Sequence, residues 1–242
     1  MNRLLKIAGP ALSGEEPNLE DYSSLGSIGT ELHQMRRNRN GFYAFESALH
    51  VFSSDNRTQR GQSIAPWNAA KGWLDSYGLL QPRLAFFAED VFGGQFGTDG
   101  TGIYSLNPET AALSHVGTTL REWAERVLDD YAYMTGYPVA HEWQSRHGEI
   151  PAGHRLIPRI PFVFGGAYSA DNMILGESVA AMRYWGKIAN SIAGVSDGAQ
   201  LTFDPSVVLS IRCAADGSDG SGICRCFAPD GGTGVSETDS RG

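Results

Sequence analysis

Apolar residues in the middle of the chain alternate with polar ones, and turns divide them into short segments, a pattern typical of strands. The turns Asp99-Gly100 and Asn107-Pro108 separate three of these segments. Successive strands joined by such short turns form an antiparallel meander. We therefore expect a run of antiparallel strands at residues 84–88, 91–98, 102–106 and 113–116.

Apolar residues at helical spacing predict helices on both sides of this strand region. Thr119 and Glu122 form a capping box, which begins a helix that extends to about Met134. Phe45 and Phe52 also fit helical spacing within residues 42–52. The other predicted helices span residues 31–39, 67–77, 138–146 and 177–192, and further strands are expected at 157–164 and 199–203.

Strands in the middle of the chain, with helices before and after them, predict an α+β fold. We expect a single domain over residues 31–205, with a mainly antiparallel central sheet and helices packed on it. Residues 1–30 are rich in glycine, serine and acidic residues, so they are predicted to form a flexible N-terminal arm. Residues 206–242 are rich in glycine, aspartate and serine and are predicted to be a disordered tail.

The most informative segment has the sequence FAEDVFGGQFG, in which two acids precede a glycine pair. Alternation along a strand would place Phe92, Gly94 and Phe96 on one face. Glycine inside a strand usually marks a bulge or the close approach of another backbone, so Gly94 is predicted to be structurally critical. Glu89 and Asp90 would point to opposite faces, and one carboxylate is expected to cap backbone N–H groups at the strand end.

This segment belongs to a longer pattern that resembles a known family. Residues 73–104, WLDSYGLLQPRLAFFAEDVFGGQFGTDGTGIY, contain a Trp, a Tyr-Gly and an apolar strand that runs into Phe-Gly-Gly. They resemble the signature region of the SUKH superfamily, which includes the Smi/Knr cell-wall regulators of fungi. Looser similarity covers about residues 40–203. The resemblance implies an immunity protein that binds and blocks a toxin delivered between competing bacterial cells, often a nuclease or a deaminase.

The charge distribution is compatible with such a partner. The net charge is −8, and residues 61–150 hold eleven acidic residues against five basic ones. An acidic surface disfavours direct nucleic-acid binding, which needs clustered Lys and Arg, and it favours a basic protein partner. The candidate partner-binding residues are Glu89, Asp90, Asp99, Asp129 and Asp130.

Catalytic and metal-binding patterns are weak. His141 and His147 lie six residues apart and point about 120° apart around a helix, which does not fit a zinc-protease helix. The three cysteines, an odd number, all lie in the last thirty residues and have no histidine near them. We therefore expect a cytoplasmic protein that is not an enzyme and that uses no cofactor, metal or membrane.

Two alternatives remain open at this point. One is a regulatory scaffold of the Smi/Knr type that binds several partners. The other is a hydrolase with a carboxylate site, which would require several acidic side chains to converge in one pocket.

Overall fold

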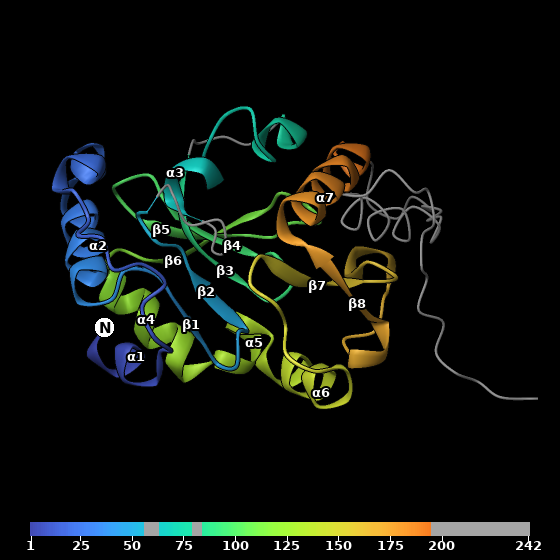
Figure 1. Ribbon diagram of the computed structural model, residues 1–242. Helices are drawn as coiled ribbons and strands as arrows, with labels where there is room; N and C mark the ends of the chain where they lie inside the picture. Colours follow the sequence, from blue (N-terminus) through green and yellow to red (C-terminus); the bar gives the residue numbers. More distant parts are fainter. Residues whose placement is uncertain (56–62, 79–83, 195–242) are drawn as a thin grey trace, which may run out of the picture.

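The computed structural model describes residues 1–55, 63–78 and 84–194, and its centre is a six-stranded antiparallel sheet (Figure 1). The strands follow one another in chain order, each paired with the next. This arrangement confirms the predicted single α+β domain with a mainly antiparallel central sheet. The strands are β1 (Phe42–Ala44), β2 (Leu49–Val51), β3 (Ala85–Asp90), β4 (Gln95–Thr98), β5 (Ile103–Leu106) and β6 (Leu113–Gly117).

Helices cover the sheet on both faces, as Figure 1 shows. Phe86 and Phe87 are neighbours in β3 and are buried in two different apolar clusters, because successive strand residues point to opposite faces. The cluster around Phe87 includes residues of α1 (Asn2–Ile7), α2 (Gly26–Asn38) and α4 (Leu120–Asp129). The cluster around Phe86 includes residues of α3 (Ile64–Trp67), the 3-10 helix η2 (Leu74–Tyr77) and α7 (Ser178–Ile192).

A smaller two-stranded sheet, β7 (His154–Pro158) paired with β8 (Met173–Glu177), packs beside the main sheet. The N–H of Leu156 donates to the carbonyl of Val91 at 2.8 Å, so the turn after β3 is tied directly to β7. Beside this junction lie α5 (Tyr131–Thr135), α6 (Tyr137–His147) and the 3-10 helices η3 (Phe162–Phe164) and η4 (Ala170–Asn172).

The prediction of a flexible arm over residues 1–30 is wrong. Leu4, Tyr22 and Ile28 are buried in the same core cluster as α4. The 3-10 helix η1 (Leu19–Leu25) leads directly into α2, which begins at Gly26. Apolar residues in this region are sparse, but tertiary packing gathers them in one place. The predicted tail, residues 206–242, and the predicted strand at 199–203 lie outside the described residues.

Two helical expectations upstream of the main strands are also wrong. Residues 42–52 form the β1–β2 hairpin, because Phe45, Glu46 and Ser47 adopt positive φ values of 52°, 50° and 68° and reverse the chain. Residues 67–77 are the end of α3 and the separate η2. Trp67 and Trp73 are both buried in one aromatic cluster, at a centroid distance of 5.5 Å, so their spacing reflects shared burial and not one continuous helix.

The downstream elements agree more closely with the sequence. The Thr119 side chain accepts a hydrogen bond from the Glu122 N–H at 3.1 Å and begins α4 as predicted. The predicted helices at 138–146 and 177–192 correspond to α6 and α7, and Glu177 caps the latter. The helix expected to reach Met134 is divided at Asp130, where φ is −131°. The strand expected over 157–164 ends at Pro158 and gives way to η3.

Candidate functional site

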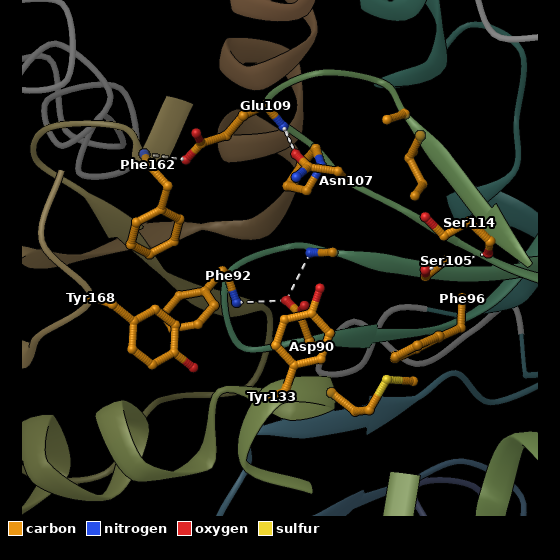
Figure 2. A pocket seen from close by; sticks show the side chains of 15 residues that line it. Asp90, Phe92, Phe96, Ser105, Asn107, Glu109, Ser114, Tyr133, Phe162 and Tyr168 are labelled. Carbon is orange, nitrogen blue, oxygen red and sulfur yellow. Dashed lines mark hydrogen bonds between the residues drawn. The ribbon is translucent and has the colours of Figure 1, made fainter. Parts of the chain in front are cut away.

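A cavity of about 380 Å³ opens at one end of the central sheet (Figure 2). The β3–β4 turn and the β5–β6 connection emerge at this end, and α5 and the segment that follows β7 complete the wall. The side chains that line the cavity include Asp90, Phe92, Glu109, Tyr133, Phe162 and Tyr168.

Asp90 shapes the β3–β4 turn. Its Oδ1 accepts hydrogen bonds from the backbone N–H of Phe92 at 2.8 Å and of Gly94 at 2.7 Å. These bonds confirm the prediction that a carboxylate caps N–H groups at the strand end. A Cβ on Gly94 would overlap the Asp90 carboxylate, so this glycine is needed for the close approach of a side chain and not for a strand bulge.

The carboxyl group of Asp90 has unusual electrostatics for an aspartate. Burial raises its pKa to about 7, although the two backbone N–H groups and the charge of Arg155 act in the opposite direction. Its second oxygen, Oδ2, accepts no hydrogen bond from the residues that the structure describes. One oxygen is therefore fixed by the turn, while the other remains available to a ligand in the cavity.

Aromatic rings surround this carboxyl group (Figure 2). Phe92 contacts Phe162 and Tyr168 in edge-to-face geometry, with centroid distances of 5.4 and 5.5 Å. Tyr133 is 80% exposed and Tyr168 is 53% exposed, yet both line the cavity. The Tyr168 hydroxyl donates to the carbonyl of Ala132 at 3.3 Å, which ties the loop after η3 to α5.

Glu109 is the second carboxyl group of the cavity, but it is occupied by the backbone. Its Oε1 accepts from the N–H of Phe162 at 3.0 Å, and its Oε2 accepts from the N–H of Val163 at 2.7 Å. Burial raises the pKa of Glu109, and these two hydrogen bonds lower it by less. Because both oxygens are used, Glu109 positions η3 and thereby holds Phe162 at the cavity wall.

Glu89 lies in the core and not on the surface. Its Oε1 is 2.7 Å from Nη2 of Arg155 and 3.0 Å from Nδ1 of His50, and all three side chains are fully buried. Burial acts to raise the pKa of Glu89, but Arg155, His50 and Gln95 together lower it below its usual value. Burial also lowers the pKa of His50 to about 4, so the imidazole is neutral at physiological pH. The prediction that Glu89 lies at a strand exterior and contacts a partner is wrong, because the side chain is inaccessible.

The other three predicted acidic residues lie at two separate places. Asp99 accepts hydrogen bonds from Thr101 and from the N–H of Gly102, and it closes the β4–β5 turn at the sheet end opposite the cavity. Asp129 and Asp130 are exposed at the junction of α4 and α5, directly before the helix that contributes Tyr133 to the cavity. The structure therefore does not gather the predicted acidic residues at one site: Asp90 lines the cavity, Asp129 and Asp130 are exposed at the α4–α5 junction, and Asp99 lies at the opposite end of the sheet.

The sequence reasoning missed the aromatic residues of the cavity. Tyr133 and Tyr168 carry no motif, and an exposed aromatic cannot be distinguished from a buried one in a single sequence. Phe92 and Phe96 both line the cavity, but Phe92 lies in the β3–β4 turn and Phe96 in β4, so the prediction that they share one strand face is wrong.

Within residues 1–55, 63–78 and 84–194, no group of three His, Cys, Asp or Glu side chains could hold a metal ion. Among the helices in these ranges, none combines the length and the apolar character needed to cross a membrane.

Comparison with known proteins supports the fold alone. No family model and no curated protein matches the sequence. Among solved structures, the chain is similar to Atu4351 from Agrobacterium tumefaciens, with a TM-score of 0.50 and 15% sequence identity. The similarity covers 76% of this chain and 86% of that one, so the two proteins share an overall fold over most of their lengths.

Proposed function

We propose that the protein is a non-enzymatic, cytoplasmic immunity protein that binds a cognate secreted toxin and occludes its active cleft. The toxin would be a basic protein of the nuclease or deaminase type. The observation that carries the proposal is the exposed aromatic and acidic surface around the cavity, which we call the pocket face. Its members are the residues Asp90, Phe92, Tyr133, Phe162 and Tyr168, which line the cavity, together with the exposed Asp129 and Asp130, which shortly precede Tyr133 in the chain.

The aromatic part of the pocket face has the composition of a binding interface. Among the described residues, five of the seven exposed large apolar side chains lie within 131–133 and 160–168, and two of them, Tyr133 and Tyr168, line the cavity. Scattered exposed apolar residues are normal, but a cluster of them marks an interaction surface. Tyrosine is enriched among the interface residues that contribute most of the binding energy, because its rigid ring buries a large area at small entropic cost.

The acidic part of the pocket face would determine which partners are accepted. Asp129 and Asp130 are exposed beside the tyrosines, and Asp90 lies at the cavity wall. Nucleases and deaminases need positive charge near their clefts to hold nucleic acid. Complementary charge speeds the encounter of two proteins and disfavours wrong partners. Occlusion of such a cleft would block the toxin without any chemical step.

One observation supports the hydrolase alternative: Asp90 and Glu109 line the same cavity, and both have raised pKa values. Carboxyl groups with raised pKa values in a cavity are candidates for acid–base catalysis. However, both oxygens of Glu109 and one oxygen of Asp90 accept backbone hydrogen bonds. A pair of carboxylates free to act on a substrate is therefore not present, which favours the binding function. The Smi/Knr-type scaffold alternative has no such observation to support it.

The proposal is tested by expressing the protein together with the product of the neighbouring gene. We expect the two products to purify as a complex and the protein to restore growth that the neighbouring product inhibits. Tyr133→Ala should weaken both effects, whereas Ile7→Ala, which also removes an exposed apolar side chain but lies on α1, should not. A neighbouring product that neither binds nor inhibits growth would overturn the proposal.

A further inference from the structure

We propose that the cavity beside Asp90 receives a cationic side chain, an arginine or a lysine, from the protein partner. The inference rests on the proposed function, since it names the group that the pocket face recognises. It follows from three features of the cavity: a carboxylate oriented by the backbone, a set of aromatic rings around it, and the absence of a contacting cation among the described residues.

The orientation of Asp90 is fixed before any ligand arrives. The N–H groups of Phe92 and Gly94 hold Oδ1, and the N–H of Asp90 itself donates to the carbonyl of Gly94 at 2.8 Å. The remaining oxygen, Oδ2, is free to accept a charge-assisted hydrogen bond. Such bonds are roughly twice as strong as neutral ones, and an oriented acceptor loses little entropy on binding.

Aromatic rings supply the second feature. Phe92, Phe162 and Tyr168 contact one another at centroid distances of 5.4 to 5.6 Å. Tyr133 of α5 also lines the cavity (Figure 2). The negative faces of such rings attract ammonium and guanidinium groups. A cavity of about 380 Å³ holds a long side chain with accompanying water. Carboxylate and rings together select an elongated cation over a neutral or anionic group.

The groups around Asp90 do not fully compensate its negative charge. Arg155 is the nearest cation that influences it, but this guanidinium is already paired with Glu89 in the core. Tyr133 and Tyr168 also line the cavity, and burial raises the pKa of Tyr168 to about 12, so its hydroxyl is neutral at physiological pH. Glu109 lines the same cavity and adds no positive charge. Burial raises the pKa of Asp90 to about 7, so the carboxylate lacks full compensation until a cation binds.

The test uses the purified protein alone and two small probes of the same shape. Nα-acetyl-arginine methylamide carries the guanidinium, and the corresponding citrulline compound replaces it by a neutral urea group. Binding would be followed by NMR through the backbone amide signals of Phe92 and Gly94. At pH 8 we expect saturable shifts with the arginine probe and at least about tenfold weaker binding of the citrulline probe, since a charged donor is lost.

The pH dependence of probe binding and substitutions at Asp90 and Tyr133 distinguish a specific cation site from nonspecific electrostatic attraction. The carboxylate fraction of Asp90 should fall from about 90% at pH 8 to about 10% at pH 6, so arginine affinity should fall about tenfold. Asp90→Asn keeps an oxygen for the turn but removes the charge, and it should abolish the preference for arginine over citrulline. Tyr133→Ala should weaken arginine binding by about two- to fivefold, the scale of an exposed cation–π contact.

A competition experiment identifies the source of the cation. Arginine probe at ten times its dissociation constant should raise the apparent dissociation constant of the toxin complex about elevenfold, because one site serves both. An unchanged complex would overturn the assignment to a partner's side chain. Equal binding of the two probes, binding unaltered in Asp90→Asn, or no binding of either probe would overturn the cation site itself.

The outcomes for the cavity and for the immunity function are separable. A toxin that is neutralised while the protein shows no preference for the arginine probe removes the cavity inference and leaves the immunity proposal. Selective arginine binding by a protein that neutralises no neighbouring toxin removes the immunity proposal and leaves the cation site in the cavity.

Discussion

Glu89 and Arg155 form an ion pair at 2.7 Å, and neither side chain is accessible to solvent. Glu89 lies in β3 of the main sheet and Arg155 in β7 of the smaller sheet, so the pair joins the two sheets. The Glu89 carboxylate also contacts the ring of His50 and accepts from the Gln95 amide at 3.4 Å. This acid therefore stabilises the fold and is not accessible to the partner that we propose.

Removing the charge of Glu89 alone should destabilise the protein strongly. Glu89→Gln leaves the guanidinium of Arg155 buried without a counterion, which typically costs about 3–5 kcal/mol. Chemical denaturation would measure the free energy of unfolding. The double variant Glu89→Gln with Arg155→Met removes both charges and should be more stable than Glu89→Gln. A double variant less stable than the single one would contradict this account of the pair.

The N-terminal segment should contribute measurably to stability. Leu4 is fully buried against α4, so Leu4→Ala should lower the free energy of unfolding by about 2–5 kcal/mol, the usual cost of a core cavity. Ile7 is on the same helix but 49% exposed, and Ile7→Ala serves as the control with a small effect. Equal, small losses in both variants would mean that α1 does not pack as the structure shows.

Gly94 should not tolerate a side chain. Gly94→Ala places a Cβ against the Asp90 carboxylate and forces that side chain out of its hydrogen bonds with the turn. We expect a loss of roughly 1–3 kcal/mol in the free energy of unfolding, typical of overpacking. Gly14 has open space around it, so Gly14→Ala should be nearly neutral. Gly94→Ala that unfolds at the same denaturant concentration as Gly14→Ala would refute this role.

Asp90 should make stability depend on pH with a definite sign. Its pKa is raised from 3.8 to about 7 in the folded state, so the protonated form is favoured by folding. The resulting stability is fully present below pH 3.8 and is lost as the pH rises to about 7. Asp90→Asn cannot ionise, so relative to the parent it should gain more stability at pH 8 than at pH 5. Thermal unfolding at both values checks this, and an identical difference at both would contradict the raised pKa.

The strand expected over residues 91–98 begins only at Gln95, because residues 91–94 form the β3–β4 turn. Sequence periodicity otherwise came close to the strands β3, β5 and β6 and to the helices α4, α6 and α7. It failed at the β1–β2 hairpin. Two-residue hairpin turns with positive φ usually contain glycine or asparagine, and Phe45, Glu46 and Ser47 give no such signal. It also failed for residues 1–30, whose few apolar side chains become core only when α4 packs against them.

The candidate site was partly visible in the sequence. One carboxylate of the Glu89-Asp90 pair was predicted to cap backbone N–H groups at the strand end, and Asp90 is the one that does so. The burial of Glu89 could not be predicted, because its counterion Arg155 lies far along the chain and only the packing of two sheets brings them together. Tyr133 and Tyr168 likewise reach the cavity from separate elements, and no local pattern marks them.

The central claim is that the pocket face binds and silences a basic toxin. The most direct measurement adds the purified protein to the purified product of the neighbouring gene and follows that product's toxic activity together with the association rate. We expect the activity to vanish at one equivalent, and Asp129→Lys with Asp130→Lys to slow association and to flatten its salt dependence while circular dichroism stays unchanged. Toxic activity that persists at a large excess of the unmodified protein would contradict the account.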